Sequence, residues 1–146
     1  MKFSAATLFA AAASAAVIGR QSAVYSVSQF SAACITHSTQ CLYSFNVIQP
    51  GTMETQGVNC TALVPANTDG TLPDVEEGTC SQSSRTFSVE RNTDGLFFSV
   101  SQPVTPSSNQ TASHEISNGE LVMSFQPNAN VQRYVGPTSF DLVYYL

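Results

Sequence analysis

The alternation of apolar and polar residues with a period of two is the feature that most restricts the fold of this chain. Tyr25 and Val27 alternate with Ser26 and Ser28, and residues 43–47 repeat the pattern. Successive side chains of an extended strand point to opposite faces, so each such run places its apolar residues on one face of a sheet. No segment beyond residue 20 has the 3.6-residue period of an amphipathic helix. The pattern therefore predicts an all-β fold.

Turn signals between the apolar runs predict three hairpins. The first joins the runs on either side of the segment Cys34–Cys41, and a bulge is expected near Phe30. The second turns at Asn92-Thr93-Asp94-Gly95, where Asp-Gly supplies the positive φ that a tight turn requires. The third, within residues 114–125, turns at Asn118-Gly119. Hairpins of this kind build antiparallel sheets.

Polar segments separate the predicted strands. Residues 66–78 follow the run Val58–Val64 and are predicted to form a long loop, and residues 103–108 a shorter one. Residues 126–137 are also predicted as a loop, with a short strand over Val131–Val135 as the alternative. The C-terminal residues 140–146 are too apolar to lie free in water, so we expect them to pair with other strands and to be a candidate for closing the structure. Roughly eight short strands without a helix indicate a small antiparallel β-barrel or sandwich.

The first residues have the pattern of a secretion signal. Lys2 precedes residues 3–17, which carry no charge and are rich in alanine. Ala13-Ser14-Ala15 then matches the small-x-small pattern that signal peptidase needs. We therefore predict a signal peptide over residues 1–20, with the mature N-terminus created by cleavage between residues 15 and 20.

Residues 21–146 are then predicted to be a single secreted domain. The apolar run of the leader is too short to span the roughly 30 Å hydrocarbon core of a bilayer, and no later run approaches the roughly 18 apolar residues that a membrane helix needs. We expect an extracellular protein without a membrane-embedded segment.

The charge of the chain beyond residue 20 disfavours polyanionic partners. Three arginines stand against ten acidic residues, a net charge of −7, and no lysine is present. Binding of phosphate groups needs clustered lysine or arginine, so nucleic acid and anionic membrane surfaces are excluded as expected partners.

Four cysteines, Cys34, Cys41, Cys60 and Cys80, predict two disulfides in an oxidising compartment. Three pairings are open. We favour Cys34–Cys41 and Cys60–Cys80, because each pair brackets a polar connection between apolar runs. A zinc site is the alternative that the spacing disfavours, since thiolate zinc sites usually have CxxC-type spacing.

Catalysis has few candidate residues in this sequence. His37 and His114 are the two possible bases for a Ser or Cys nucleophile, and no GxSxG segment is present. We therefore expect no enzyme, no metal and no cofactor, and interpret both histidines as ordinary residues of the surface.

The acidic segment Asp74, Glu76 and Glu77, with Asp69 nearby, is a candidate interaction loop. Its spacing does not match the calcium-binding loop of an EF-hand, and glycosidase carboxylates usually project from rigid strands. The bridge Cys60–Cys80 would restrain this loop and present it to a basic partner.

Two sequons are present. Asn109-Gln110-Thr111 lies on a predicted loop and is the glycosylation candidate. Asn59-Cys60-Thr61 also satisfies the rule, but its cysteine is expected in a disulfide and Asn59 in a strand.

The aromatic residues admit two interpretations, core packing or a pocket for a flat phenolic ligand. Phe97 and Phe98 are adjacent in one predicted strand, so they must point to opposite faces, and one of them needs a partner surface or a second buried layer. The other aromatic residues considered for these roles are Tyr43, Phe45, Phe87, Phe125, Phe140, Tyr144 and Tyr145.

Several segments, taken in their order and spacing, carry a resemblance to a known family. They are Tyr25-Ser26-Val27-Ser28-Gln29-Phe30, Cys41-Leu42-Tyr43-Ser44-Phe45-Asn46-Val47, Val58-Asn59-Cys60-Thr61-Ala62, Cys80 followed by Phe87-Ser88-Val89, and Asp94-Gly95-Leu96. Over about residues 24–104 the chain resembles the fungal secreted proteins named for the Alternaria major allergen and the related elicitors that induce the hypersensitive response.

The resemblance implies an antiparallel β-barrel with a central Cys60–Cys80 bridge. It also implies a secreted, non-enzymatic protein that acts at the plant or host interface and binds host extracellular defence proteins or small phenolics. The chain departs from the allergen because no cysteine follows Cys80 and none is left unpaired. We therefore expect a monomer or a non-covalent dimer. The first hypothesis is an effector or elicitor that acts by surface recognition, and the alternative is a binder of small aromatic, flavonoid-like molecules.

Overall fold

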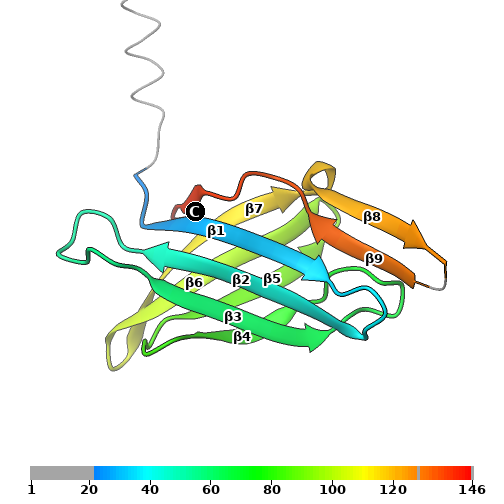
Figure 1. Cartoon of the computed structure of the whole chain (residues 1–146). Helices are drawn as coiled ribbons and strands as arrows, with labels where there is room; N and C mark the ends of the chain where they lie inside the picture. The colour runs from blue at the N-terminus through cyan, green and yellow to red at the C-terminus, as the bar shows by residue number, and fades with distance from the viewer. Residues whose placement is uncertain (1–21, 128, 146) are drawn as a thin grey trace, which may run out of the picture.

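The computed structural model describes residues 22–127 and 129–145, so the predicted signal peptide lies outside the described residues (Figure 1). Ten strands and one short 3-10 turn account for its regular structure. The strands are β1 (Tyr25–Cys34), β2 (Gln40–Ile48), β3 (Val58–Pro65), β4 (Val75–Cys80), β5 (Thr86–Asn92), β6 (Gly95–Thr105), β7 (Ser108–Ser117), β8 (Leu121–Gln126), β9 (Ala129–Tyr134) and β10 (Phe140–Leu142). The 3-10 turn η1 (Asn118–Glu120) lies between β7 and β8.

The strands form one antiparallel sheet in the order β7-β6-β5-β4-β3-β2-β1-β9-β8, and β10 pairs with β1. The sheet curls so that β7 approaches β1 again (Figure 1). There β10 lies on β1 and the following residue, Val143, bridges to Ser113 of β7. The C-terminal segment thus nearly closes a barrel, which confirms the all-β fold and the expected pairing of that segment.

The two expected disulfides are present. Cys34 and Cys41 are opposite each other at the end of the β1–β2 hairpin, and their sulfurs are 2.02 Å apart. Cys60 of β3 is bonded to Cys80 of β4, with the sulfurs 1.99 Å apart. Two disulfides are typical of proteins that fold in an oxidising, extracellular type of compartment.

A bulge in β1 keeps its apolar residues inside the barrel. The register with β2 shifts between Ser28 and Ser31, and Gln29 has a φ of 54°. The shift turns Phe30 inward, where it is 2% exposed. The bulge expected near this residue is confirmed.

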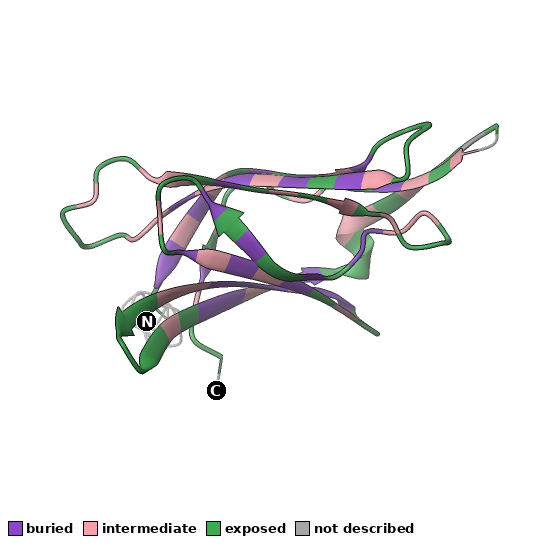
Figure 2. Cartoon of the chain, turned by 90° about the horizontal axis from the view of Figure 1, so that it is seen from below, coloured by how far each residue is buried: buried purple, intermediate pink, exposed green. Residues whose placement is uncertain are grey.

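Aromatic side chains fill the interior of the barrel. The ring of Phe30 lies 5.3 Å from that of Phe98, 4.9 Å from that of Tyr134 and 5.2 Å from that of Phe140. Phe45 packs edge to face on Phe98, with ring centres 5.0 Å apart. Buried residues alternate along the strands with exposed ones, as Figure 2 shows in purple and green. Core packing is therefore the role of most of these aromatic residues.

The C-terminal segment covers the outward-pointing member of the Phe97–Phe98 pair. Phe98 is fully buried in the core. Phe97 points to the outer face of β6, where the ring of Tyr145 lies edge to face 5.1 Å away. The partner surface that the sequence predicted for one of the two phenylalanines is thus provided for Phe97 by Tyr145 of the same chain.

The hairpin expected at Asn118-Gly119 does not form, and this prediction was wrong. Residues 118–120 make the 3-10 turn, where the Glu120 carboxylate accepts the backbone N–H of Ser117 at 3.1 Å. Gly119 is not among the described glycines with a positive φ, so the primed turn that a two-residue hairpin needs is not made. The chain instead leaves β7, and β8 pairs with β9.

All three predicted loops are partly strands. β6 and β7 extend almost to each other, and hydroxyl pairs such as Thr105–Ser108 at 2.6 Å join them where no apolar alternation marks a strand. Residues 75–78 belong to β4, whose register with β5 shifts between Val75 and Gly78. Gly78 is needed here because a Cβ would overlap the ring of Phe87. The strand inside residues 126–137 exists as β9.

No helix among the described residues is long and apolar enough to cross a membrane.

Candidate functional site

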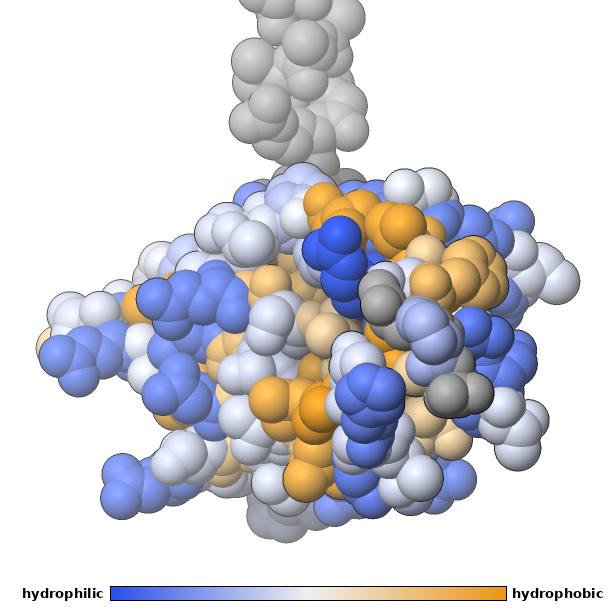
Figure 3. Space-filling view, turned by 45° about the vertical axis from the view of Figure 1, so that its right-hand side comes forward, coloured by the Kyte–Doolittle hydropathy of each residue, from blue (hydrophilic) through white to orange (hydrophobic). Residues whose placement is uncertain are grey.

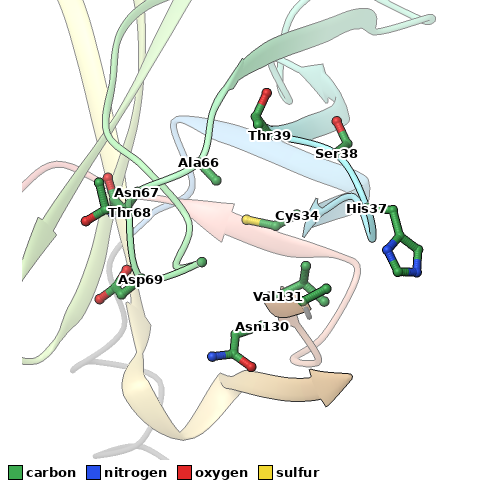
Figure 4. Close-up of a pocket in the computed structure, with 12 residues that line it drawn as sticks. Cys34, His37, Ser38, Thr39, Ala66, Asn67, Thr68, Asp69, Asn130 and Val131 are labelled. Carbon is green, nitrogen blue, oxygen red and sulfur yellow. The ribbon is translucent and has the colours of Figure 1, made fainter. Parts of the chain in front are cut away.

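A cleft of about 900 Å³ opens at one end of the barrel, between the β1–β2 turn, the loop after β3 and the start of β9. We call it the end cleft. It is lined by Cys34, His37, Ser38, Thr39, Ala66, Asn67, Thr68, Asp69, Gly70, Ala129, Asn130 and Val131. Figure 4 shows Cys34 in the middle of these residues, the loop of Asn67, Thr68 and Asp69 on one side, and Asn130 below.

The three walls of the end cleft are fastened to one another. The Cys34–Cys41 disulfide fixes the β1–β2 turn. The backbone N–H of Ala66 donates to the carbonyl of Thr39 at 2.8 Å, which ties the loop to that turn. The N–H of Gln132 donates to the carbonyl of Gly70 at 3.0 Å, which ties the same loop to β9. The cleft is therefore largely preformed.

Gly70 allows the loop to approach β9 closely. Its φ is +82°, in the left-handed region that favours glycine. A Cβ at this position would also overlap the carbonyl oxygen of Asn130. The glycine is thus required twice, by its backbone angle and by the contact between the two walls.

A local network of hydrogen bonds shapes the loop of the end cleft. The Asp69 carboxylate accepts the Thr71 hydroxyl at 2.6 Å and the Thr71 N–H at 3.1 Å. These bonds hold the pKa of Asp69 below its usual range. The Asn67 side chain donates to the Thr71 hydroxyl at 2.9 Å. The sequence placed Asp69 near a candidate loop without showing this turn.

Arg91 lies in the same end of the barrel, next to the end cleft. Its Nη2 donates to the carbonyl of Leu72 at 2.9 Å and to Oε1 of Gln132 at 2.7 Å. The same Gln132 oxygen accepts the N–H of Leu72 at 2.9 Å. Close by, the hydroxyl of Tyr43 donates to the carbonyl of Pro73 at 2.7 Å, and burial raises the pKa of this tyrosine. Buried polar groups thus hold this end in one arrangement.

Arg85 closes the opposite end. Its guanidinium binds both carboxylate oxygens of Glu54, at 2.7 and 2.9 Å, and its Nε donates to Gln102 at 2.7 Å. The charge also lies over the ring of Tyr25, 5.5 Å from its centre. The bond with Arg85 lowers the pKa of Glu54. The β2–β3 loop, which carries Glu54, is anchored to the barrel by this pair.

A second cavity, of about 450 Å³, lies at this end, and we call it the rear cavity. It is lined by Ser22, Ala23, Val24, Gln49, Pro50, Gln110 and Tyr144. Gln110 accepts a hydrogen bond from the Gln49 side chain at 3.0 Å and donates one to the Tyr144 hydroxyl at 2.7 Å. The rear cavity therefore combines a tyrosine ring with oriented amides.

The candidate interaction loop, Asp74, Glu76 and Glu77, is partly a strand in the structure. Glu76 and Glu77 lie on β4, at the register shift with β5, and both are exposed. Asp74 is also exposed and accepts the backbone N–H of Arg91 at 2.8 Å. None of the three is among the described residues that line either cavity. They form an acidic patch on the wall of the barrel rather than a flexible loop.

The structure separates the two histidines. His37 lies exposed at the edge of the end cleft, in a turn where its φ is 62°. His114 is on β7 and stacks on Phe140 with ring centres 4.1 Å apart, and burial lowers its pKa. Among the described residues no hydrogen bond joins either imidazole to a serine or threonine hydroxyl, and no three His, Cys, Asp or Glu residues are grouped as metal ligands.

The two sequons lie in strands. Asn109 is exposed near the start of β7, opposite Pro103 of β6, so its side chain is accessible for modification. Asn59 is exposed on β3 and accepts a hydrogen bond from Asn46 at 3.2 Å. The neighbour of Asn59 is the disulfide-bonded Cys60.

Comparison with known proteins gives no relative: no family model, no curated protein and no solved structure matches the chain.

Proposed function

We propose that this protein is a secreted, fungal effector or elicitor that acts without catalysis, by surface recognition at the interface with a plant host. The observation that carries the proposal is the contrast between a solid interior and a preformed end cleft. Phe30 and the aromatic residues around it fill the barrel, whereas the cleft of about 900 Å³ lies outside it. Such a molecule presents a rigid surface for recognition.

Further support comes from the chemistry of secretion and from the resemblance of the sequence. The leader pattern of residues 1–20 and the two disulfides are typical of an extracellular protein. The segments of residues 24–104 resemble secreted elicitors that provoke cell death in plants. The acidic patch of Asp74, Glu76 and Glu77 offers a second contact surface, for a basic host defence protein.

Infiltration of leaves with the purified, oxidised protein tests this proposal. We expect necrosis or an oxidative burst, and the same protein after reduction and alkylation serves as the control for loss of the fold. A folded, monodisperse preparation that leaves the tissue unchanged would contradict the proposal.

A second candidate function, binding of flat phenolic molecules, is favoured by the rear cavity. Tyr144 offers a ring for stacking and Gln49 and Gln110 offer amides for phenolic hydroxyls. Titration with flavonoids, followed by fluorescence, should saturate in the micromolar range, and Tyr144→Ala should abolish saturation. A titration curve that is the same for Tyr144→Ala and the parent protein, or no saturation of the parent protein, would contradict this second function.

A further inference from the structure

We propose that the end cleft binds a neutral oligosaccharide chain. The inference rests on the proposed function, because it names the class of molecule that the recognition surface takes. It follows from the chemistry of the lining residues, from one exposed aromatic ring beside them, from charge, and from the way in which the walls are held.

The lining of the end cleft is rich in hydroxyl and amide groups. Ser38, Thr39 and Thr68 provide hydroxyls, and Asn67 and Asn130 provide amides. Each hydroxyl both donates and accepts, and each amide offers an acceptor oxygen and two N–H donors. This mixture matches the hydroxyl groups of a sugar, which also donate and accept.

Three of these side chains, those of Thr39, Thr68 and Asn130, remain available to a ligand. Ser38 and Asn67 are used in turns of the chain, where they bond to Gln40 and Thr71. By contrast, the three available side chains are exposed and have no hydrogen-bond partner among the described residues. Thr68 and Asn130 lie on different walls, the loop and β9, so a ligand between them would contact both.

Phe125 supplies an apolar surface at the rim. It is directly opposite Asn130 in the β8–β9 hairpin, and register partners in an antiparallel pair point to the same face. Its side chain is 74% exposed, although burial of such a ring would be favourable. Apolar side chains form separate patches among polar ones on the face that includes this end of the barrel (Figure 3). The aliphatic C–H face of a sugar ring packs well on the face of an aromatic ring.

The charge of the cleft indicates a neutral ligand. None of the three arginines beyond residue 20 is among its described lining residues, and Asp69 places a carboxylate there. The net charge of −7 on the chain beyond residue 20 adds to the repulsion of phosphates and uronates. A polyhydroxylated molecule without charge avoids this cost.

The size and rigidity of the cleft agree with a chain of several sugars. Its volume of about 900 Å³ is near the upper end of the roughly 300–1,000 Å³ that ligand pockets occupy. The Cys34–Cys41 disulfide and the bond between Gly70 and Gln132 hold its walls before any ligand arrives. A preformed site loses less entropy on binding, which matters for ligands that bind through many weak contacts.

Calorimetric titration of the mature, oxidised protein tests the proposal. The probes are laminarihexaose, cellohexaose, xylohexaose and chitohexaose, with oligogalacturonate as the charged comparison. We expect saturable binding of at least one neutral hexaose and none of oligogalacturonate. Phe125→Ala and Asn130→Ala should each weaken binding by about tenfold, whereas Tyr145→Ala, which removes an exposed aromatic ring outside the cleft, should leave it unchanged. Circular dichroism of each variant establishes that it is folded.

Three results would overturn the inference: no binding of any neutral hexaose, binding that Phe125→Ala and Asn130→Ala leave unaltered, or preferred binding of oligogalacturonate. The leaf assay separates this failure from that of the proposed function. If the protein provokes the leaf response without binding sugars, only the proposed oligosaccharide site is contradicted. If it binds sugars but is inert in leaves, only the elicitor proposal is contradicted.

Discussion

Single residues close the two ends of the barrel. Arg91 on β5 and Arg85, the residue immediately before β5, alternate in step with the buried Phe87 and Val89, so both guanidinium groups point inward, one at each end of the strand. A charge in this position is tolerated only when it is paired or hydrogen-bonded. For Arg85 the partner is Glu54, whose Oε1 lies 2.7 Å from the arginine Nη2.

We predict that Glu54→Gln lowers the free energy of unfolding by about 1–2 kcal/mol at neutral pH, a modest figure because Glu54 borders the solvent. The pKa of Glu54 is lowered from 4.5 in the folded state, so its contribution is present above that value and is lost as the pH falls through the folded pKa. The difference between variant and parent should therefore shrink toward pH 3, as measured by urea unfolding. Glu90→Gln, on the exposed face of β5, is the control. Equal losses for the two variants would contradict this role of Glu54.

Gly70 allows a prediction with a matched control. Gly51 and Gly70 have φ values of +77° and +82°, but a Cβ at Gly51 meets no atom within 4 Å, whereas one at Gly70 overlaps Asn130. Replacement by alanine should cost about 1 kcal/mol at Gly51 from backbone strain and about 3 kcal/mol or more at Gly70, where the clash is added. Chemical denaturation measures both. A similar cost at the two positions would show that the cleft wall yields to the side chain.

Among the elements, the two disulfide-linked strand pairs stabilise different parts of the barrel. Cys34–Cys41 closes a separation of 7 residues and Cys60–Cys80 one of 20, so their removal should cost about 2.5 and 3 kcal/mol in the entropic account. We predict that only the double alanine variant of Cys34 and Cys41 also increases amide exchange in the β1–β2 turn and residues 66–70, because that bridge fixes the wall of the end cleft. Hydrogen exchange measured by mass spectrometry checks the difference. Loosening of the same segments by loss of Cys60–Cys80 would argue against it.

The sequence predicted the elements that depend on local chemistry and missed those that depend on their neighbours. The Asp94-Gly95 hairpin and the bulge near Phe30 follow from turn chemistry and alternation, and both are present. Asn118-Gly119 has the same turn signal, yet the Glu120 carboxylate at the N–H of Ser117 favours a 3-10 turn. That glutamate three residues after a serine was the available clue.

At the scale of the whole molecule, the end cleft could not be predicted because its walls come from residues 34–39, 66–70 and 129–131. Nothing in one sequence states that β9 adds to β1, or that β8 pairs with β9 and not with its chain neighbour β7. The two inward arginines could have been recognised from the sequence, since Arg85 and Arg91 continue the alternation of Phe87 and Val89. An inward charge marks the end of a barrel, and both arginines lie at such an end.

Closure by the C-terminal segment should determine whether the barrel unfolds as one unit. Leu142 is fully buried, Phe140 packs on Phe30, and Val143 bridges to Ser113. Deletion of residues 140–146 exposes these apolar surfaces and leaves β1 and β7 unpaired along one edge, so we predict a loss of about 4 kcal/mol or more, a broadened unfolding transition and binding of a hydrophobic dye. Deletion of residues 144–146 keeps both the β10 pairing and the bridge, and should cost far less, since its main described effect is to uncover Phe97. Calorimetry and urea unfolding measure the free energy of unfolding of the two truncated proteins. Equal values would contradict the prediction, because β1 and β7 would then stay together without β10.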